Sequence, residues 1–140
     1  MLKIILSVLL LSLLFLFSST SFAQNSNDFH VVHVQTNKMK AMLGDDADAF
    51  NQLLKRQADV MRSDSRVVRV SALRHFWGND SRDLVLVAEF KTEMDLFSFY
   101  NDFDSLLEKA MSKEQLDADN ELWDKYVGQH SDEIYRVVAE

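Results

Sequence analysis

Three side chains of this sequence are candidates for chemistry: His33, His75 and Glu89. Each lies in a segment rich in β-branched and other apolar residues, and the alternation within these segments places all three on one face of a predicted sheet. A histidine beside a carboxylate can transfer protons near neutral pH, and two histidines with a carboxylate can bind a metal ion. The alternative is that the histidines only form hydrogen bonds inside the fold or at its solvent-exposed rim. They are therefore candidate catalytic residues without an assigned reaction.

A second group consists of Leu73, His75 and Trp77, which are two residues apart from one another and come just before a predicted turn. Side chains with this spacing face the same side of a strand, so the apolar and aromatic members could form the wall of a ligand pocket. Aromatic residues are also enriched at subunit interfaces. Packing in a dimer is therefore the preferred interpretation for Phe76, and both interpretations stay open for Trp77.

The composition excludes several classes of function. The chain has 140 residues, with 15 Lys and Arg against 22 Asp and Glu, and a net charge of -7. An acidic chain does not attract a phosphate backbone, so we expect no nucleic-acid partner. The absence of Cys removes disulfides, thiolate nucleophiles and Cys-type zinc sites. The sequence predicts no cofactor, although haem or a metal ion stays open as an alternative.

The first 23 residues have the layout of a secretory signal peptide. Lys3 precedes an apolar run over residues 4–17, and Ser21 and Ala23 are small residues at the positions that signal peptidase requires. The alternative is an uncleaved anchor, but about 14 apolar residues are few for a span of about 20. We expect cleavage after Ala23 and a secreted or periplasmic bacterial protein with no stable membrane span. Residues 24–28 are then a flexible arm, and residues 29–140 a single domain.

The hydrophobic pattern of the mature chain predicts four strands and three helices. The strands are expected over residues 29–35, 66–77, 83–91 and 133–138, and the helices over 46–62, 93–111 and 115–127. Gly128 is expected to end the last helix as its C-terminal cap. This order is that of the ferredoxin-like βαββαβ fold with one added helix. The fold class is α+β, with a four-stranded antiparallel sheet and helices on one face.

Alternate positions along the predicted strands divide into an apolar set and a mixed set. The apolar set is expected beneath the helices and contains Val32, Val34, Val68, Val70, Ala72, Leu84, Leu86, Ala88 and Phe90. The mixed set, which includes His33, Arg69 and Glu89, is expected on the open face. A second copy of the protein covering this face would account for its mixture of aliphatic and polar side chains.

The segment from Leu73 to Lys91 (LRHFWGNDSRDLVLVAEFK), continuing through residues 92–100, resembles the dimeric α+β barrel superfamily. That superfamily includes antibiotic-biosynthesis-monooxygenase-like, EthD-like and NIPSNAP-like domains. The shared pattern is a strand, a tight hairpin, a strand ending near Glu-Phe and a helix rich in Phe. The resemblance covers residues 29–138 as a fold, and it implies a homodimer with a pocket between sheet and helices.

The resemblance does not imply one reaction, because members of the superfamily carry out cofactor-free oxygenation, haem breakdown and isomerisation, and some have no established chemistry. The export signal and the helical stretch near Trp123 depart from the superfamily. One hypothesis is an exported protein of this type that binds an apolar or aromatic compound, with monooxygenase-like activity left open. The alternative is a non-catalytic homodimerisation or interaction domain of the cell envelope. Whether the protein is an enzyme stays undecided at this point.

Overall fold

The structure, a computed structural model, describes residues 29–42, 44–78 and 82–138. Seven elements follow one another in the predicted order: β1 (Val31–Met39), α2 (Asp46–Ser63), β2 (Val67–Arg74), β3 (Asp83–Phe90), α3 (Glu93–Ala110), α4 (Lys113–Tyr126) and β4 (Val127–Arg136). The predicted signal peptide and flexible arm lie outside these residues. Among the helices described, none is both long enough and apolar enough to cross a membrane.

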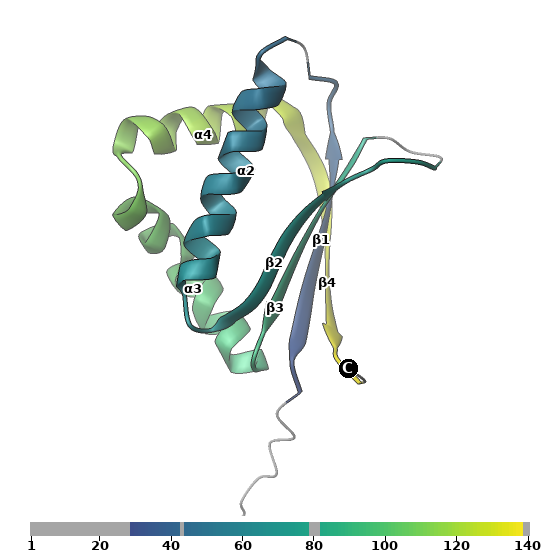
Figure 1. The fold of residues 1–140 in the computed structure, drawn as a ribbon, viewed down its shortest axis with the longest axis vertical. Helices are drawn as coiled ribbons and strands as arrows, with labels where there is room; N and C mark the ends of the chain where they lie inside the picture. Colours follow the sequence, from purple (N-terminus) through teal and green to yellow (C-terminus); the bar gives the residue numbers. More distant parts are fainter. Residues whose placement is uncertain (1–28, 43, 79–81, 139–140) are drawn as a thin grey trace, which may run out of the picture.

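The four strands form one antiparallel sheet in the order β2-β3-β1-β4. The three helices lie on one face of the sheet and leave the opposite face uncovered (Figure 1). We call the uncovered side the open face. The predicted α+β ferredoxin-like fold is therefore confirmed, and the added helix α4 immediately precedes the last strand.

Two strands are longer than their sequences indicate. β1 continues to Met39 rather than ending at Gln35, and β4 begins at Val127 rather than at Glu133. β4 is an edge strand that is exposed along nearly its whole length. Its sequence therefore lacks the alternation that marks a half-buried strand. Its extent depends on pairing with β1, whose register with β4 shifts between Asn37 and Met39.

Gly128 does not cap a helix, contrary to the prediction. It is the second residue of β4, and a Cβ atom at this position would lie 2.9 Å from the backbone oxygen of Lys38. No real side chain fits so close to backbone. Gly128 therefore allows β4 to approach β1 closely where the chain leaves α4.

The predicted division into two faces is correct for β3 but wrong for β1. Residues directly opposite each other in a ladder share a face, and His33 lies opposite the buried Ala88. His33 and Gln35 therefore lie beneath the helices, while Val32 and Val34 lie on the open face. β2 is irregular between Val67 and Arg69, so the expected alternation is also broken there and Val68 is exposed.

The core beneath the helices consists of two clusters of buried side chains. The first core cluster contains Val31, Ala58, Met61, Val70, Ala88, Phe90, Leu96 and Phe99. The second core cluster contains Phe50, Leu53, Leu54, Leu84 and Tyr126, with Leu86 and Trp123 packed against it. Burial of these large apolar groups is the main contribution that holds the helices on the sheet.

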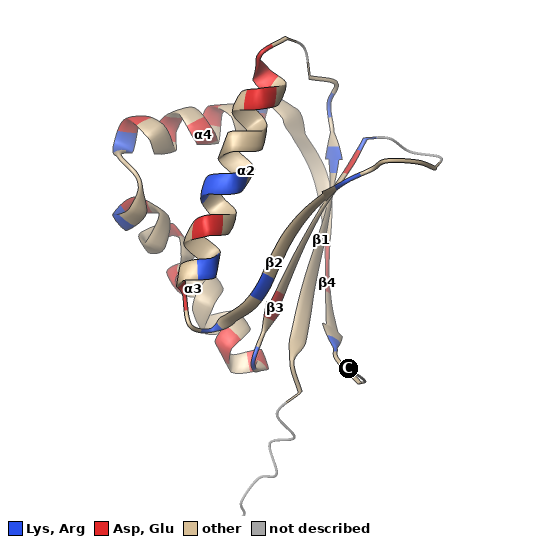
Figure 2. Ribbon diagram, viewed as in Figure 1, with Lys and Arg blue, Asp and Glu red and all other residues tan. Residues whose placement is uncertain are grey.

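Charged side chains are concentrated on the helices, and the sheet carries few (Figure 2). α2 has acidic residues in its first turn and Arg62 in its last turn, which are the signs that the helix dipole favours. Thr92 caps α3, as its position in the sequence suggests, because its hydroxyl accepts a hydrogen bond from the backbone of Asp95. Ser112 caps α4 in the same way.

Candidate functional site

A pocket of about 330 Å³ lies between the sheet and the three helices. Members of both core clusters line it: Met61 and Val70 belong to the first cluster, Leu54 belongs to the second, and Trp123 packs against the second. Aliphatic and aromatic groups supply most of the wall, and a few polar groups interrupt it. This combination of an apolar cavity with a small number of placed polar groups is the usual form of a small-molecule site.

His33 brings an imidazole into this pocket from the centre of the sheet. Its Nδ1 atom lies 2.7 Å from the hydroxyl of Tyr100, and its Nε2 atom lies 3.0 Å from a carboxylate oxygen of Asp132. A carboxylate can only accept, so in neutral His33 the Nε2–H donates to Asp132, and Nδ1 accepts from Tyr100. The imidazole is thereby oriented on both sides, as a general base must be.

Asp132 extends this set of contacts towards the solvent. Its second carboxylate oxygen lies 3.2 Å from Nε2 of His130, on the exposed edge strand β4. The side chain of His33 is 14% exposed and that of Asp132 is 44% exposed. The imidazole of His33 therefore lies beside a carboxylate that is itself exposed to solvent.

Tyr100 is held by a group of aromatic rings on α3 and β3. Its ring centroid lies 5.8 Å from that of Phe90, 5.5 Å from Phe99 and 6.3 Å from Phe103. Burial, together with the negative charge of Asp132, raises the pKa of Tyr100 to about 12. The phenol is therefore neutral at physiological pH and is a hydrogen-bond donor at the pocket.

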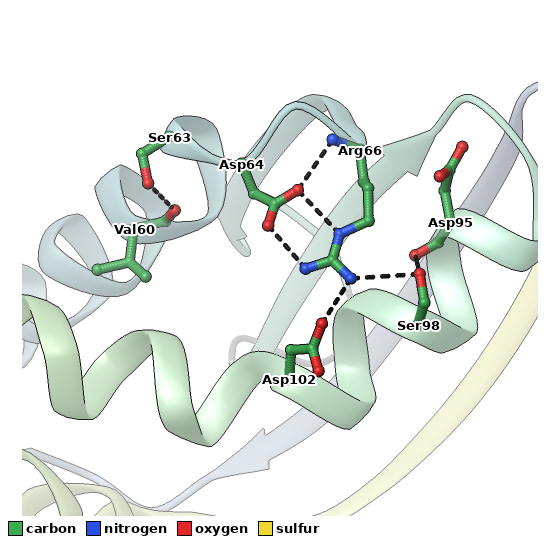
Figure 3. A network of polar contacts seen from close by, with 7 residues as sticks. All are labelled: Val60, Ser63, Asp64, Arg66, Asp95, Ser98 and Asp102. Atoms are coloured by element: carbon green, nitrogen blue, oxygen red, sulfur yellow. Dashed lines mark hydrogen bonds and ion pairs between the residues drawn. The ribbon is translucent and has the colours of Figure 1, made fainter.

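Arg66, the residue before β2, joins the end of α2 to α3 through the polar contacts that Figure 3 shows. Its guanidinium donates to both oxygens of Asp64, at 2.9 and 2.7 Å, and from another nitrogen to Ser98 and Asp102 of α3. Tyr100 lies between Ser98 and Asp102 in the sequence. The hydrogen bonds of Arg66 also hold the pKa of Asp64 below its usual value.

Another ion pair fixes α4 on α2 beside the pocket. Arg56 of α2 donates two hydrogen bonds to the carboxylate of Asp119 on α4, the one from Nε being 3.0 Å long. Asp119 is only 2% exposed, and Gln115 donates to it as well. The neighbours of this pair in sequence, Gln57 and Asn120, both line the pocket. The ion pair therefore sets the separation of two pocket walls.

The structure separates the three candidate catalytic residues. The expectation that His33, His75 and Glu89 share a face is wrong, because Glu89 lies opposite Val32 on the open face. There its carboxylate accepts a hydrogen bond from His30 at 2.7 Å. His75 lies just beyond β2, with its ring against Gly78. In the part of the chain that the structure describes, no three or more acidic or histidine side chains are grouped to bind a metal ion.

The suggested ligand-binding residues also lie apart from the pocket. Leu73 is 52% exposed and Trp77 is 92% exposed, and neither lines the pocket, nor does His75. Six residues of the site were not predicted from the sequence: Tyr100, Asp132, Gln35, Gln57, Asn120 and Trp123. The spacing of Tyr100 with Phe103 on one side of α3 was an available signal. Asp132 was not predicted because it lies in the first half of β4, which the sequence pattern did not identify as a strand.

The open face of the sheet also carries a group of apolar side chains. Val32, Val34, Val85 and Val87 occupy its two central strands and are partly buried, while Leu73 and Tyr135 flank them and are about half exposed. These apolar side chains share the open face with Arg69, Glu89 and Thr36, so the face is mixed in character.

Comparison with known proteins establishes the fold and not the function. No protein-family profile matches the sequence, and the search of curated proteins finds no match. The chain is similar to a variant of SnoaB, a cofactor-independent oxygenase from Streptomyces nogalater, with 13% identity and a TM-score of 0.53 over 79% of this chain and 95% of that one. It is similar to a putative antibiotic biosynthesis monooxygenase from Nitrosomonas europaea, with 14% identity and a TM-score of 0.54 over 78% and 90% of the two chains.

A third similar structure is a dimeric ferredoxin-like protein from an uncultured marine organism, with 12% identity and a TM-score of 0.52 over 84% of this chain and 95% of that one. These likenesses confirm the resemblance in fold to the superfamily suggested by the sequence. At identities this low, they carry no assignment of substrate or reaction.

Proposed function

We propose that this chain is an exported small-ligand-binding protein of the dimeric α+β barrel type, and that it binds an apolar or aromatic compound between the sheet and the helices. The observation that carries the proposal is the oriented imidazole of His33 inside a largely apolar pocket. The leader of residues 1–23 supports export. The fold likeness to a cofactor-independent oxygenase supports a site that acts through its own side chains.

The polar groups favour a ligand with a weakly acidic hydroxyl. Such a hydroxyl donates to the oxygen of Tyr100 while the Tyr100 hydroxyl donates to Nδ1 of His33. Transfer of both protons along these bonds leaves the ligand as an anion, Tyr100 neutral and His33 as an imidazolium beside Asp132. This is general base catalysis with Tyr100 in contact with the ligand and His33 as the final proton acceptor.

A monooxygenase-like reaction extends this proposal. The anion of a ligand that contains an acidic CH₂ group is oxidised by O₂ at that carbon. The CH₂ group becomes C=O, and the second oxygen atom leaves as water with the two hydrogens. The ligand itself supplies the electrons in this balance. The residues of the pocket contribute the proton transfer and the exclusion of water.

Binding of 2-naphthol and of naphthalene, measured by equilibrium dialysis, tests the site. The wild type should bind 2-naphthol several-fold more tightly, because a hydrogen bond at a partly buried site contributes about 1 kcal/mol. His33→Leu and Tyr100→Phe should each remove that preference and retain naphthalene binding. The control Trp77→Phe changes an exposed aromatic residue outside the pocket and should bind both probes like the wild type. Failure of the wild type to bind either probe would contradict the proposal.

Native mass spectrometry of the protein from its own export compartment tests the other parts of the proposal. A chain that begins at Gln24, is dimeric and carries added mass is the expected result. An intact leader contradicts the predicted cleavage, and a monomer contradicts the dimeric assembly.

The second candidate function is a non-catalytic homodimerisation or interaction domain of the cell envelope. The apolar side chains of the open face favour it, since that surface does not depend on the pocket. A bare dimer that binds neither naphthalene nor 2-naphthol would favour this function over ligand binding.

A further inference from the structure

The pocket contains three carboxamide side chains that have no partner within the described residues. Gln35 comes from the sheet, Gln57 from α2 and Asn120 from α4, and all three line the cavity. Their side chains form no hydrogen bond with any other side chain or backbone group of residues 29–42, 44–78 and 82–138. Each carboxamide offers one acceptor and two donor hydrogens. Gln35 and Gln57 are partly buried and Asn120 is exposed, and the described protein groups leave all three available to a ligand.

Gln35 and Asn120 are separated from the hydroxyl of Tyr100 along the pocket, and Gln57 lies on α2 between Leu54 of the second core cluster and Ala58 of the first. Gln35 is two residues beyond His33 on β1 and faces the helices one row further along, a displacement of about 7 Å. It lies opposite Leu86, which packs against the second core cluster, and Asn120 is one helical turn before Trp123 of the same region. Tyr100 instead contacts Phe90 and Phe99 of the first core cluster.

The charged residues that line the pocket limit the charge that a ligand can carry. None of the residues lining it is Lys or Arg, and Asp104 lies at its edge. A carboxylate or phosphate on the ligand would therefore meet a negative charge and no cation. Neutral hydroxyl and carbonyl groups are matched to carboxamides, which can donate to and accept from either.

From these observations we infer that the ligand is an uncharged compound with an apolar body and oxygen-bearing groups at two separate ends. One end binds at Tyr100 and His33, and Gln35, Gln57 and Asn120 recognise the other as specificity-determining residues. This inference rests on the proposed ligand-binding function and adds the substrate class. It distinguishes a two-ended oxygenated ligand from a hydrocarbon with one hydroxyl.

The test compares 2,6-dihydroxynaphthalene with 2-naphthol by equilibrium dialysis. The wild type should bind the diol about 3- to 10-fold more tightly, the gain from one or two added hydrogen bonds. The triple variant Gln35→Met, Gln57→Met and Asn120→Leu keeps the side-chain volumes similar. It should lose the preference for the diol and bind both probes with equal affinity. The matched control Gln52→Met alters an exposed glutamine of α2 outside the pocket and should keep the full preference.

Each other outcome overturns the inference in a recognisable way. A preference for the diol that persists in the triple variant shows that the carboxamides do not recognise the second end. Tighter binding of 6-hydroxy-2-naphthoate than of the diol shows that the ligand class is anionic. If the triple variant binds neither probe, the three single variants are measured instead. Each of them should bind the diol more weakly than the wild type does, and an unchanged affinity for the diol in all three would overturn the inference. Absence of 2-naphthol binding in the wild type refutes the proposed function itself, and the inference with it.

Discussion

The hydroxyl of Tyr100 lies 2.7 Å from Nδ1 of His33, although the two residues are 67 positions apart in the sequence. Their rings meet edge to face, with centroids 5.1 Å apart and planes at 85°. The contact joins the centre of the sheet to α3 inside the pocket. It also makes the ionisation of Tyr100 a direct measure of whether the candidate site is formed.

The first prediction concerns this ionisation. The pKa of Tyr100 is raised from 10.0 to about 12, so the folded state holds the proton after the unfolded state has lost it. Its contribution to the free energy of unfolding is complete below pH 10 and is lost as the pH rises towards 12. Tyrosinate absorbance should show Tyr100 titrating near pH 12 as the difference between the wild type and Tyr100→Phe. Tyr100→Phe should also show a smaller loss of stability over this range.

Asp132→Asn provides a second measurement on the same group. Removal of the negative charge should lower the pKa of Tyr100, because that charge opposes formation of the phenolate. An unchanged titration in Asp132→Asn would argue against the arrangement of Tyr100, His33 and Asp132.

The second prediction concerns the ion pair between α2 and α4. Arg56→Met leaves the carboxylate of Asp119 buried with only Gln115 as a partner, and should cost about 3 kcal/mol of unfolding free energy in urea. Asp119→Leu should cost less, because Arg56 is 31% exposed and can reach water. The double variant should therefore be more stable than Arg56→Met alone. A double variant less stable than both single variants would contradict this account.

The third prediction concerns acid stability. The hydrogen bonds from Arg66 lower the pKa of Asp64 below 3.8, so its contribution is complete above that pH and is lost as the pH falls below it. Asp64→Asn should reduce the free energy of unfolding at pH 7 by about 1–3 kcal/mol. Its stability should then fall less steeply than that of the wild type below pH 4. Glu108→Gln, an exposed change on α3, should leave the wild-type profile unchanged.

The fourth prediction concerns the open face. A second copy that covers this face would bury Val85, which lies between Leu73 and Thr36 in the ladder. Val85→Glu should convert the proposed dimer to a monomer in light scattering coupled to gel filtration, since two like charges would meet in an apolar interface. Met94→Glu makes the same chemical change at an exposed position on the helical side and should leave the dimer intact. Equal molar masses for the two variants would place the interface elsewhere.

The fifth prediction separates the hairpin from the pocket. Trp77 is 92% exposed at the end of the hairpin, whereas Trp123 lines the pocket. In a Trp77→Phe background the remaining tryptophan fluorescence comes from Trp123 alone. That fluorescence should change when 2-naphthol binds. In a Trp123→Phe background, the fluorescence of Trp77 should not respond to bound 2-naphthol.

The sequence alone determined the order of the elements and the class of the fold. The stripe of Phe50, Leu54, Ala58 and Met61 marks α2, and the β-branched and apolar run from Leu84 to Phe90 marks β3. These signals are local, because a residue's burial repeats with the period of the element that carries it. The cap at Thr92 is local in the same sense.

Tertiary structure alone decided which side of β1 faces the helices. The apolar side chains of Val32 and Val34 suggested that these two residues face the helices. The pairing of His33 with Ala88 shows instead that His33 faces the helices. An apolar residue is equally stable beneath helices or beneath a second subunit. The residue types of β1 therefore do not show which of its two faces the helices cover. The site followed from that decision, because His33 meets Tyr100 and Asp132 only on the helix side. Its partners are 67 and 99 residues away, and no periodicity along the chain records a contact at such a separation.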